Sequence, residues 1–207
     1  MLIKLYEENP SPKHIQAVAE CLRDGGIIIY PTDTVYTFGC DIYKPKAIEK
    51  IARIKGIDSK KNNFSIVCEN LSSLSDFTKP ISNPTFKMMR RCLPGPFTFI
   101  LFANSKVPKL FQRKKKTVGI RIPNNAIVQH IIEELGNPIL STSLHHKDKI
   151  LDYISDAELI YEEYKNQVDI VIDGGIGGNT PSTIIDCTQS ENVIIREGLG
   201  NLSLIDL

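Results

Sequence analysis

The sequence is poor in the features that mark secreted, membrane-spanning and strongly nucleic-acid-binding proteins. Its 207 residues contain five cysteines, none in a C-x-x-C pair. This scattered, odd set predicts reduced thiols, packed mostly as small hydrophobes in a cytosolic protein. No apolar run approaches transmembrane length, and the first residues lack a signal-peptide pattern. The net charge of +1 gives no whole-protein field toward nucleic acid or membrane. We therefore expect a cytoplasmic protein without membrane association.

Linkers, internal repeats and low-complexity segments are also missing from the sequence. A length of 207 residues fits one large domain with a substantial core. The hydrophobic content of 42% and the charged content of 24% are ordinary for globular proteins. The sequence therefore predicts a single domain over residues 1–207, with its core at about 10–200.

Hydrophobic periodicity predicts alternating helices and strands, and hence a single α/β domain with a mixed sheet. Ser11 and Pro12 predict a helix start, and Gly25-Gly26 its end. Another helix begins near Pro45, and a capping box of Ser155 and Glu158 predicts a helix over 156–165. Further helices are expected at 71–77, 86–92 and 127–135, and strands at 27–30, 64–68, 97–103, 118–122, 138–140, 168–172, 183–187 and 192–196.

The most informative segment is Tyr30-Pro31-Thr32-Asp33-Thr34-Val35-Tyr36. The preceding β-branched run, 27–29, predicts a buried strand that stops at Pro31, because proline cannot donate a ladder hydrogen bond. Polar side chains therefore crowd a strand exit, which is where ligands usually bind in open α/β sheets. A polar turn, with Asp and Thr side chains capping the local backbone, explains the residues equally well.

Lys55 is the second notable residue, because it continues the apolar stripe formed by Ile48, Ile51 and Ala52. A lysine on a buried helix face needs a counter-charge or water. It is either a snorkelling lysine at a helix C-terminus, where the dipole favours a cation, or a group that faces a bound anion. Its place on the inner face favours the second interpretation.

Three other patterns suggest function but also have simpler structural explanations. The loop Gly174–Gly178 follows a strand, but no helix and no Gly-Lys-Ser/Thr comes after it, so we expect a turn or lid rather than a phosphate cradle. His145 and His146 have no third ligand at convincing spacing, which favours a surface loop over a metal site. The basic run Arg113–Lys116 is either a solvated segment beside an edge strand or a contact for RNA phosphates, and we favour the first.

Cations, hydroxyls and one carboxylate fall at predicted strand or helix ends. This mixture suits the binding of a polyanion beside an ammonium group. It does not suit a covalent nucleophile, because no serine lies in a G-x-S-x-G elbow and no cysteine lies in a recognisable nucleophile motif. The residues are Asp33, Lys55, Arg121, Ser143, Ser182, Thr183 and Arg196.

In their order along the chain, seven short motifs resemble the YrdC-like family, which includes the L-threonylcarbamoyladenylate synthases. The resemblance covers about residues 10–200, nearly the whole chain. Each motif is weak alone, but seven in the correct order are specific. They are Tyr30–Tyr36, Lys55, Leu93–Thr98, Val118–Pro123, Ser141-Thr142-Ser143, Pro181–Asp186 and Arg196-Glu197-Gly198.

The resemblance implies a twisted α/β sheet with a concave, cationic cleft and a reaction that forms threonylcarbamoyl-AMP from L-threonine, bicarbonate and ATP. This product serves tRNA modification, and Mg²⁺ is expected with the ATP; no metal ligand is assigned. The chemistry implies positioning and charge stabilisation without a covalent catalytic residue. By resemblance the substrate-binding residues are Thr32, Thr34, Tyr36, Arg121 and Ser182, and the nucleotide-binding residues are Lys55, Lys60, Lys61, Ser141, Ser143 and Arg196.

The sequence departs from the family pattern at three positions, and its segments Asn62-Asn63-Phe64 and Thr142-Ser143-Leu144 resemble the YciO branch. Ile57 stands where the family has the arginine of Lys-x-Arg, so Lys60 or Lys61 would have to compensate. His145 replaces the asparagine of Ser-Ala-Asn, and Thr37 replaces a glycine. Two hypotheses follow: a synthase, with reduced or altered activity, or a protein of the same fold that binds nucleotide or structured, double-stranded RNA without synthesis. The oligomeric state is not predicted.

Overall fold

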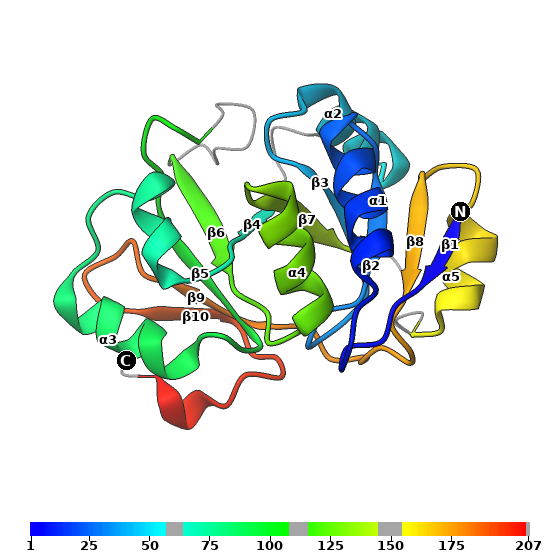
Figure 1. The fold of residues 1–207 in the computed structure, drawn as a ribbon. Coiled ribbons are helices and arrows are strands. Elements are labelled where there is room, and N and C mark those ends of the chain that lie inside the picture. The colour runs from blue at the N-terminus through cyan, green and yellow to red at the C-terminus, as the bar shows by residue number, and fades with distance from the viewer. Residues whose placement is uncertain (57–63, 108–115, 145–154, 206–207) are drawn as a thin grey trace.

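The structure, a computed structural model, describes residues 1–56, 64–107, 116–144 and 155–205. Within these ranges the chain forms one ten-stranded mixed sheet with helices on both faces (Figure 1). The strand order is β1-β8-β2-β3-β7-β4-β6-β5-β9-β10. Several residues singled out in the sequence lie outside the described ranges: Ile57, Lys60, Lys61, Arg113, Lys114, Lys115, His145 and His146.

The strands confirm the predicted mixed sheet and add two that were not predicted. The additions are β1 (Leu2–Lys4) and β3 (Thr37–Asp41). β3 was missed because its sequence TFGCD is short, polar at both ends and contains Gly39, but Gly39 leaves room for the Tyr30 ring on the neighbouring strand. The others are β2 (Ile28–Tyr30), β4 (Ser65–Val67), β5 (Phe97–Phe102), β6 (Thr117–Arg121), β7 (Ile139–Ser143), β8 (Ile170–Asp173), β9 (Thr183–Asp186) and β10 (Val193–Arg196).

Pairing runs in both directions across this sheet. β8 is parallel to β1 and β2, β4 to β6, and β5 to β9, whereas the remaining neighbours are antiparallel. β6 therefore lies inside the sheet, between β4 and β5. The interpretation of the basic run as protection of an edge strand is wrong, because the strand that follows Lys116 has partners on both sides.

Helices occur near every predicted range, but α3 begins three residues earlier than predicted, residues 71–76 form a 3₁₀ turn, and one predicted cap is wrong. They are α1 (Pro12–Arg23), α2 (Pro45–Ile54), α3 (Asn83–Cys92), α4 (Ala126–Leu135) and α5 (Ala157–Tyr164), with 3₁₀ turns η2 (Leu71–Asp76) and η4 (Leu202–Leu204). The capping box of Ser155 and Glu158 is wrong. Asp156 caps α5, because its carboxylate directly precedes the first turn and accepts from the backbone nitrogens of Glu158 and Leu159 at 2.8 and 3.3 Å.

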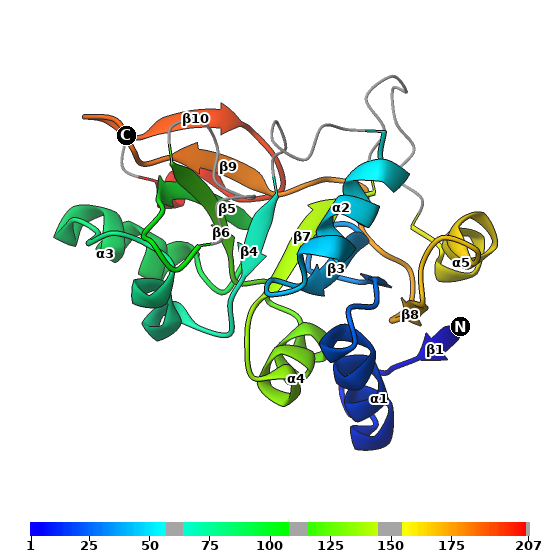
Figure 2. The same cartoon turned by 90° about the horizontal axis from the view of Figure 1, so that it is seen from above.

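Two apolar layers hold the sheet between the helices (Figures 1 and 2). One face packs Ile28, Tyr30 and Ile139 against α1 and α4, and the other packs Phe38 and Phe99 in a core that includes α2, α3 and α5. No helix among the described residues is long and apolar enough to cross a membrane. Tyr30 lies on the first face, whereas Tyr36 belongs to the core of the second face and Lys55 directly follows α2, which packs there.

Candidate functional site

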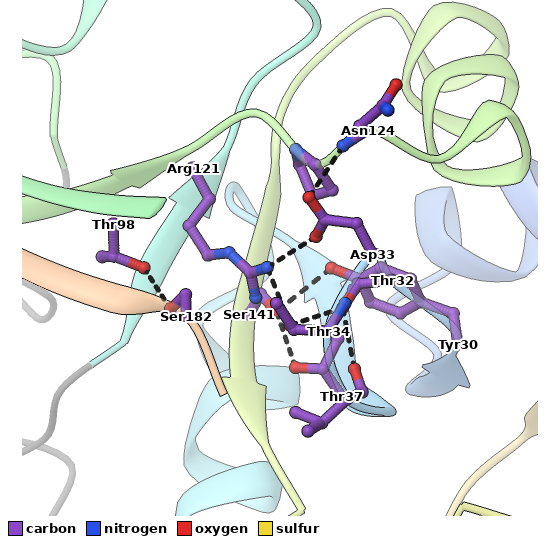
Figure 3. Close-up of polar contacts among 12 residues, drawn as sticks. Tyr30, Thr32, Asp33, Thr34, Thr37, Thr98, Arg121, Asn124, Ser141 and Ser182 are labelled. Carbon is purple, nitrogen blue, oxygen red and sulfur yellow. Dashed lines mark hydrogen bonds and ion pairs between the residues drawn. The ribbon is translucent and has the colours of Figure 1, made fainter. Parts of the chain in front are cut away.

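A buried cluster of Thr32, Asp33, Thr34 and Arg121 forms where the turn between β2 and β3 meets the end of β6 (Figure 3). The Nη2 atom of Arg121 donates to Asp33 Oδ1 and to Thr34 Oγ1, both at 3.0 Å. The other Asp33 oxygen accepts from the backbone nitrogen of Asn124 at 3.0 Å. Asp33 therefore does not cap its own turn: it accepts from a backbone nitrogen 91 residues away and holds a buried cation.

The Arg121–Asp33 ion pair is almost completely removed from water. The two side chains are 9% and 10% exposed, respectively. Burial lowers the pKa of Arg121, but the adjacent Asp33 carboxylate opposes this effect, and the guanidinium stays charged at neutral pH. Its Nε is buried and has no hydrogen-bond partner among the described residues. A buried donor of this kind is costly unless an acceptor reaches it.

The threonine hydroxyls next to Arg121 have a fixed hydrogen-bond direction. Thr32 Oγ1 donates its one proton to Val35 O at 2.8 Å and accepts from Thr34 N at 3.1 Å. Thr34 Oγ1 lies 3.0 Å from Thr32 Oγ1 and must therefore donate to it. Thr34 then accepts from Arg121. The cluster presents guanidinium donors and hydroxyl acceptors to an incoming ligand. This combination suits a carboxylate that has a hydrogen-bond donor next to it.

Beneath this cluster, a second buried network joins Tyr30, Thr37 and Ser141. The Tyr30 hydroxyl donates to Ser141 Oγ at 3.1 Å, and Thr37 Oγ1 lies 2.9 Å from the same oxygen. Burial raises the pKa of Tyr30 to about 12, so the phenol stays protonated. Ser141, a predicted nucleotide-binding residue, is 3% exposed and is surrounded by these partners. Its hydroxyl connects β2, β3 and β7 under the site.

Lys55 ends α2 and turns toward β7. Its ammonium group donates to Thr142 Oγ1 at 3.1 Å and to the backbone oxygen of Ser143. Partial burial lowers its pKa to about 8, because both acceptors are neutral oxygens and, among the described residues, no carboxylate balances the charge. Lys55 is thus a partly dehydrated cation beside Ser143, another predicted nucleotide-binding residue. The anion-facing interpretation of Lys55 stays a prediction.

A third group of polar residues lies across the sheet, at β5, β9 and β10. Ser182 Oγ lies 2.8 Å from Thr98 Oγ1, and Arg196 donates from Nε and Nη2 to Ser182 O at 3.1 and 2.8 Å. Figure 3 shows the Thr98–Ser182 pair on the strands beside Arg121. Thr183 points elsewhere: its hydroxyl is buried between Gly200 O and the backbone nitrogen of Gly198.

Tyr36 also has partners that the sequence did not suggest. Its hydroxyl donates to Gly175 O at 2.7 Å and accepts from Gly174 N at 3.1 Å. Burial raises its pKa to about 12. The glycine loop therefore lies against the Thr-Asp-Thr segment. A direct contact between Tyr36 and a substrate stays a prediction.

The structure brings together Thr32, Thr34 and Arg121 directly, pairs Lys55 with Ser143, and pairs Ser182 with Arg196. Lys60 and Lys61 lie outside the described residues. Sequence reasoning missed Asn124, Thr98 and Tyr30 as partners. It counted Asp33 among the candidate polar residues but not among the substrate- or nucleotide-binding ones. Only the charge complementarity of Asp33 and Arg121 could have suggested their pairing. No group of three or more His, Cys, Asp or Glu suited to a metal occurs in the described part of the chain.

A family model named Sua5/YciO/YrdC, described as "Telomere recombination", matches residues 20–198. The chain belongs to this family. The predicted membership of the YrdC-like family is confirmed. The uncharacterized protein YciO of Escherichia coli K12 is 40% identical over 199 residues, which cover 96% of this chain and 95% of the relative. The crystal structure of E. coli YciO matches with a TM-score of 0.92 and 38% identity, over 99% and 98% of the two chains.

Proteins with named activity or ligand are more distant family members. The threonylcarbamoyl-AMP synthase of Pseudoalteromonas translucida is 30% identical over 182 residues, 86% of this chain and 95% of that protein. A crystal structure of Pyrococcus abyssi Sua5 complexed with L-threonine matches with a TM-score of 0.87 and 27% identity, over 96% of this chain and 57% of that one. These matches confirm the twisted α/β fold; the cationic cleft stays a prediction.

Proposed function

We propose that this protein forms threonylcarbamoyl-AMP from L-threonine, bicarbonate and ATP. The observation that carries the proposal is the buried Arg121 guanidinium, whose Nε has no partner among the described residues and which lies beside Thr34. A small carboxylate is the ligand that this donor favours, since guanidinium matches carboxylate geometry. That a family member, P. abyssi Sua5, is described in complex with L-threonine supports threonine as the acid.

The proposed reaction needs positioning rather than a nucleophilic side chain. The threonine amine and bicarbonate give a carbamate and water. A carbamate oxygen then attacks the α-phosphorus of ATP, forming the new P–O bond as the bond to pyrophosphate breaks. Arg121 and Ser182 would hold threonine, Lys55 the phosphates, and Ser143 and Arg196 the rest of the nucleotide. Such catalysis works by alignment and charge neutralisation.

Magnesium would enter with ATP as part of the substrate. Mg²⁺ is usually held by one or two carboxylates together with substrate phosphates, and it keeps several waters. Lys55 would then neutralise the phosphate charge that the ion leaves unbalanced.

Pyrophosphate release in the presence of ATP, Mg²⁺ and bicarbonate tests the proposal. Release should depend on L-threonine, and L-valine, which has the same shape without the hydroxyl, should give a much lower rate because the site's polar groups would be left unpaired. Equal release with and without threonine would contradict the proposal. Tight ATP binding without any release would favour the alternative, a nucleotide-binding protein of this fold.

The pH dependence of ATP affinity should report the charge of Lys55. Because its pKa is about 8, the side chain is cationic below that pH and loses its proton above it. The phosphates favour the cation, so ATP affinity should be constant near neutral pH, fall as pH rises through about 8, and be accompanied by proton uptake. Calorimetry in buffers of different ionisation enthalpy measures this uptake. Lys55→Met, which has a similar length and no charge, should remove it; persistence of the uptake in that variant would assign it to another group.

Restoring the two family residues should raise the rate. Ile57 and His145 lie outside the described residues, so this prediction rests on the sequence alone. Ile57→Arg together with His145→Asn would add a phosphate-binding fork and an amide donor–acceptor pair. Threonine-dependent pyrophosphate release should increase by about tenfold, equivalent to about 1.4 kcal/mol of transition-state stabilisation. A folded double variant that binds ATP but is no faster than the original would place the difference elsewhere in the site.

RNA binding by the basic run remains a second proposal, because four consecutive cations, Arg113–Lys116, can contact RNA phosphates. Affinity for double-stranded RNA should then fall steeply with salt, and replacing Arg113 to Lys116 by glutamine should flatten that slope through lost counterion release. A gel-shift titration over a range of salt concentrations measures both. The absence of any shift at low salt would exclude this form of binding. The cytoplasmic location also stays a prediction.

A further inference from the structure

The short segment Gly174–Ser182 connects two strands that lie far apart in the sheet. It joins β8 to β9, and six strands lie between these two in the sheet order. Seven strand spacings of about 4.8 Å amount to about 34 Å along the sheet. The ten steps from Asp173 to Thr183 span at most about 35 Å when fully extended. Figures 1 and 2 show this segment, in orange, crossing from β8 to β9 under a strongly twisted sheet.

The first end of this segment is fixed against the threonine side of the site. The Tyr36 hydroxyl accepts a hydrogen bond from Gly174 N and donates one to Gly175 O. Gly175 has a φ of +91°, a conformation that favours glycine. Gly177 N donates to Ser155 O at 2.8 Å. Gly178 lies so close to the Thr-Asp-Thr turn that a Cβ there would stand 2.1 Å from Thr34 O. Only glycine allows this approach.

The second end is fixed against the nucleotide side. Leu199 N donates to Pro181 O at 2.8 Å, and Arg196 donates twice to Ser182 O. Only Asn179 and Thr180, both exposed, lie between the two anchored ends. The four steps from Gly178 to Ser182 reach at most about 14 Å. Along a flat sheet, β3 and β9 would lie about 24 Å apart, which is more than these four steps can reach. The segment can join its two ends only because the sheet is twisted and the direct path is shorter than the path along the sheet.

We propose that Gly174–Ser182 is a fixed-length strap that sets the distance between the threonine side and the nucleotide side of the site, with Tyr36 as its positioning residue. The proposal rests on the proposed function for its catalytic consequence. The structural part stands separately: the strap is bound at one end to Tyr36, beside Thr34, and at the other to Arg196 and Leu199. A change in its length should leave each side intact and misplace one reactant relative to the other.

The length of the strap is tested by inserting one glycine between Asn179 and Thr180. The affinities for threonine and for ATP, measured separately by calorimetry, should change by less than about threefold, whereas the rate of threonylcarbamoyl-AMP formation should fall by about 100-fold, the size expected of a small misplacement. Asn179→Gly is the matched control, because it adds flexibility without length, and it should stay near the original rate. An insertion variant that is folded and equally fast would overturn the proposal.

The positioning role of Tyr36 is tested in the free protein, so that it does not depend on activity. Tyr36→Phe should speed hydrogen exchange of the Gly174 amide by about tenfold or more, because that amide loses its acceptor. Tyr30→Phe is the control, since it also removes a buried phenol hydroxyl but one that bonds to Ser141; it should leave the Gly174 amide unchanged. Unaltered exchange in Tyr36→Phe would overturn this part. If the original protein makes no product but the exchange result holds, the proposed function fails while the strap remains. The strap is then tested by the coupling between threonine binding and ATP binding, which the glycine insertion should weaken. Unchanged coupling in the insertion variant would overturn the strap proposal.

Discussion

Replacing Arg121 with alanine should lower the free energy of unfolding by about 3–5 kcal/mol, because it leaves the Asp33 carboxylate buried without its cation. The Asp33 side chain is 10% exposed, and its remaining partner is the backbone nitrogen of Asn124. The same substitution should abolish threonine binding. Urea unfolding at neutral pH measures the first effect and calorimetry the second. The double variant Arg121→Ala/Asp33→Asn should recover part of the stability, since it no longer buries an unpaired charge, but none of the binding.

Arg121→Lys separates the charge from the geometry. Lysine keeps a cation beside Asp33, so most of the stability should return. It lacks the planar fork, and the loss of one charged hydrogen bond should weaken threonine binding by about 1.5–3 kcal/mol. A lysine variant that binds threonine as tightly as the original protein would show that Arg121 serves the fold and not the ligand.

Replacing Lys55 with alanine should weaken ATP binding by about 1.5–3 kcal/mol, the value typical of a hydrogen bond to a charged group. The reason is its position: Lys55 contacts only the neutral oxygens of Thr142 and Ser143 in the contacts that the structure describes, so its charge is available to phosphate. Lys50 offers a matched control on the same helix. It is about half exposed and lies 3.8 Å from Asp169, and Lys50→Ala should leave ATP affinity unchanged. Unchanged affinity in Lys55→Ala would restore the snorkelling interpretation.

Much of the fold could be predicted from local sequence, because helices and buried strands leave periodic signals. The buried stripe of α2 and the glycine that ends α4 are examples: Gly136 adopts a φ of +77°, as a helix-ending glycine does. The strand β3 could not be predicted in this way. Its stability comes from pairing with β2 and β7 rather than from an apolar pattern of its own.

The candidate site was predictable in its residue types but not in its contacts. Thr34 and Arg121 are 87 residues apart, and only the sheet order brings the end of β6 to the turn after β2. No spacing rule encodes such a long-range contact. The same holds for Tyr36 and Gly175, which are 139 residues apart. The sequence suggested a turn or lid for the glycine loop, whereas its attachment to Tyr36 follows only from the three-dimensional arrangement.

Mass spectrometry of a reaction with ¹³C-labelled bicarbonate tests the central claim most directly. With ATP, Mg²⁺ and L-threonine present, we expect threonylcarbamoyl-AMP that is one mass unit heavier than the product from unlabelled bicarbonate, and none when threonine is omitted. A protein that is folded and binds both ATP and threonine, yet yields no labelled adenylate, would contradict the claim that this site joins the two.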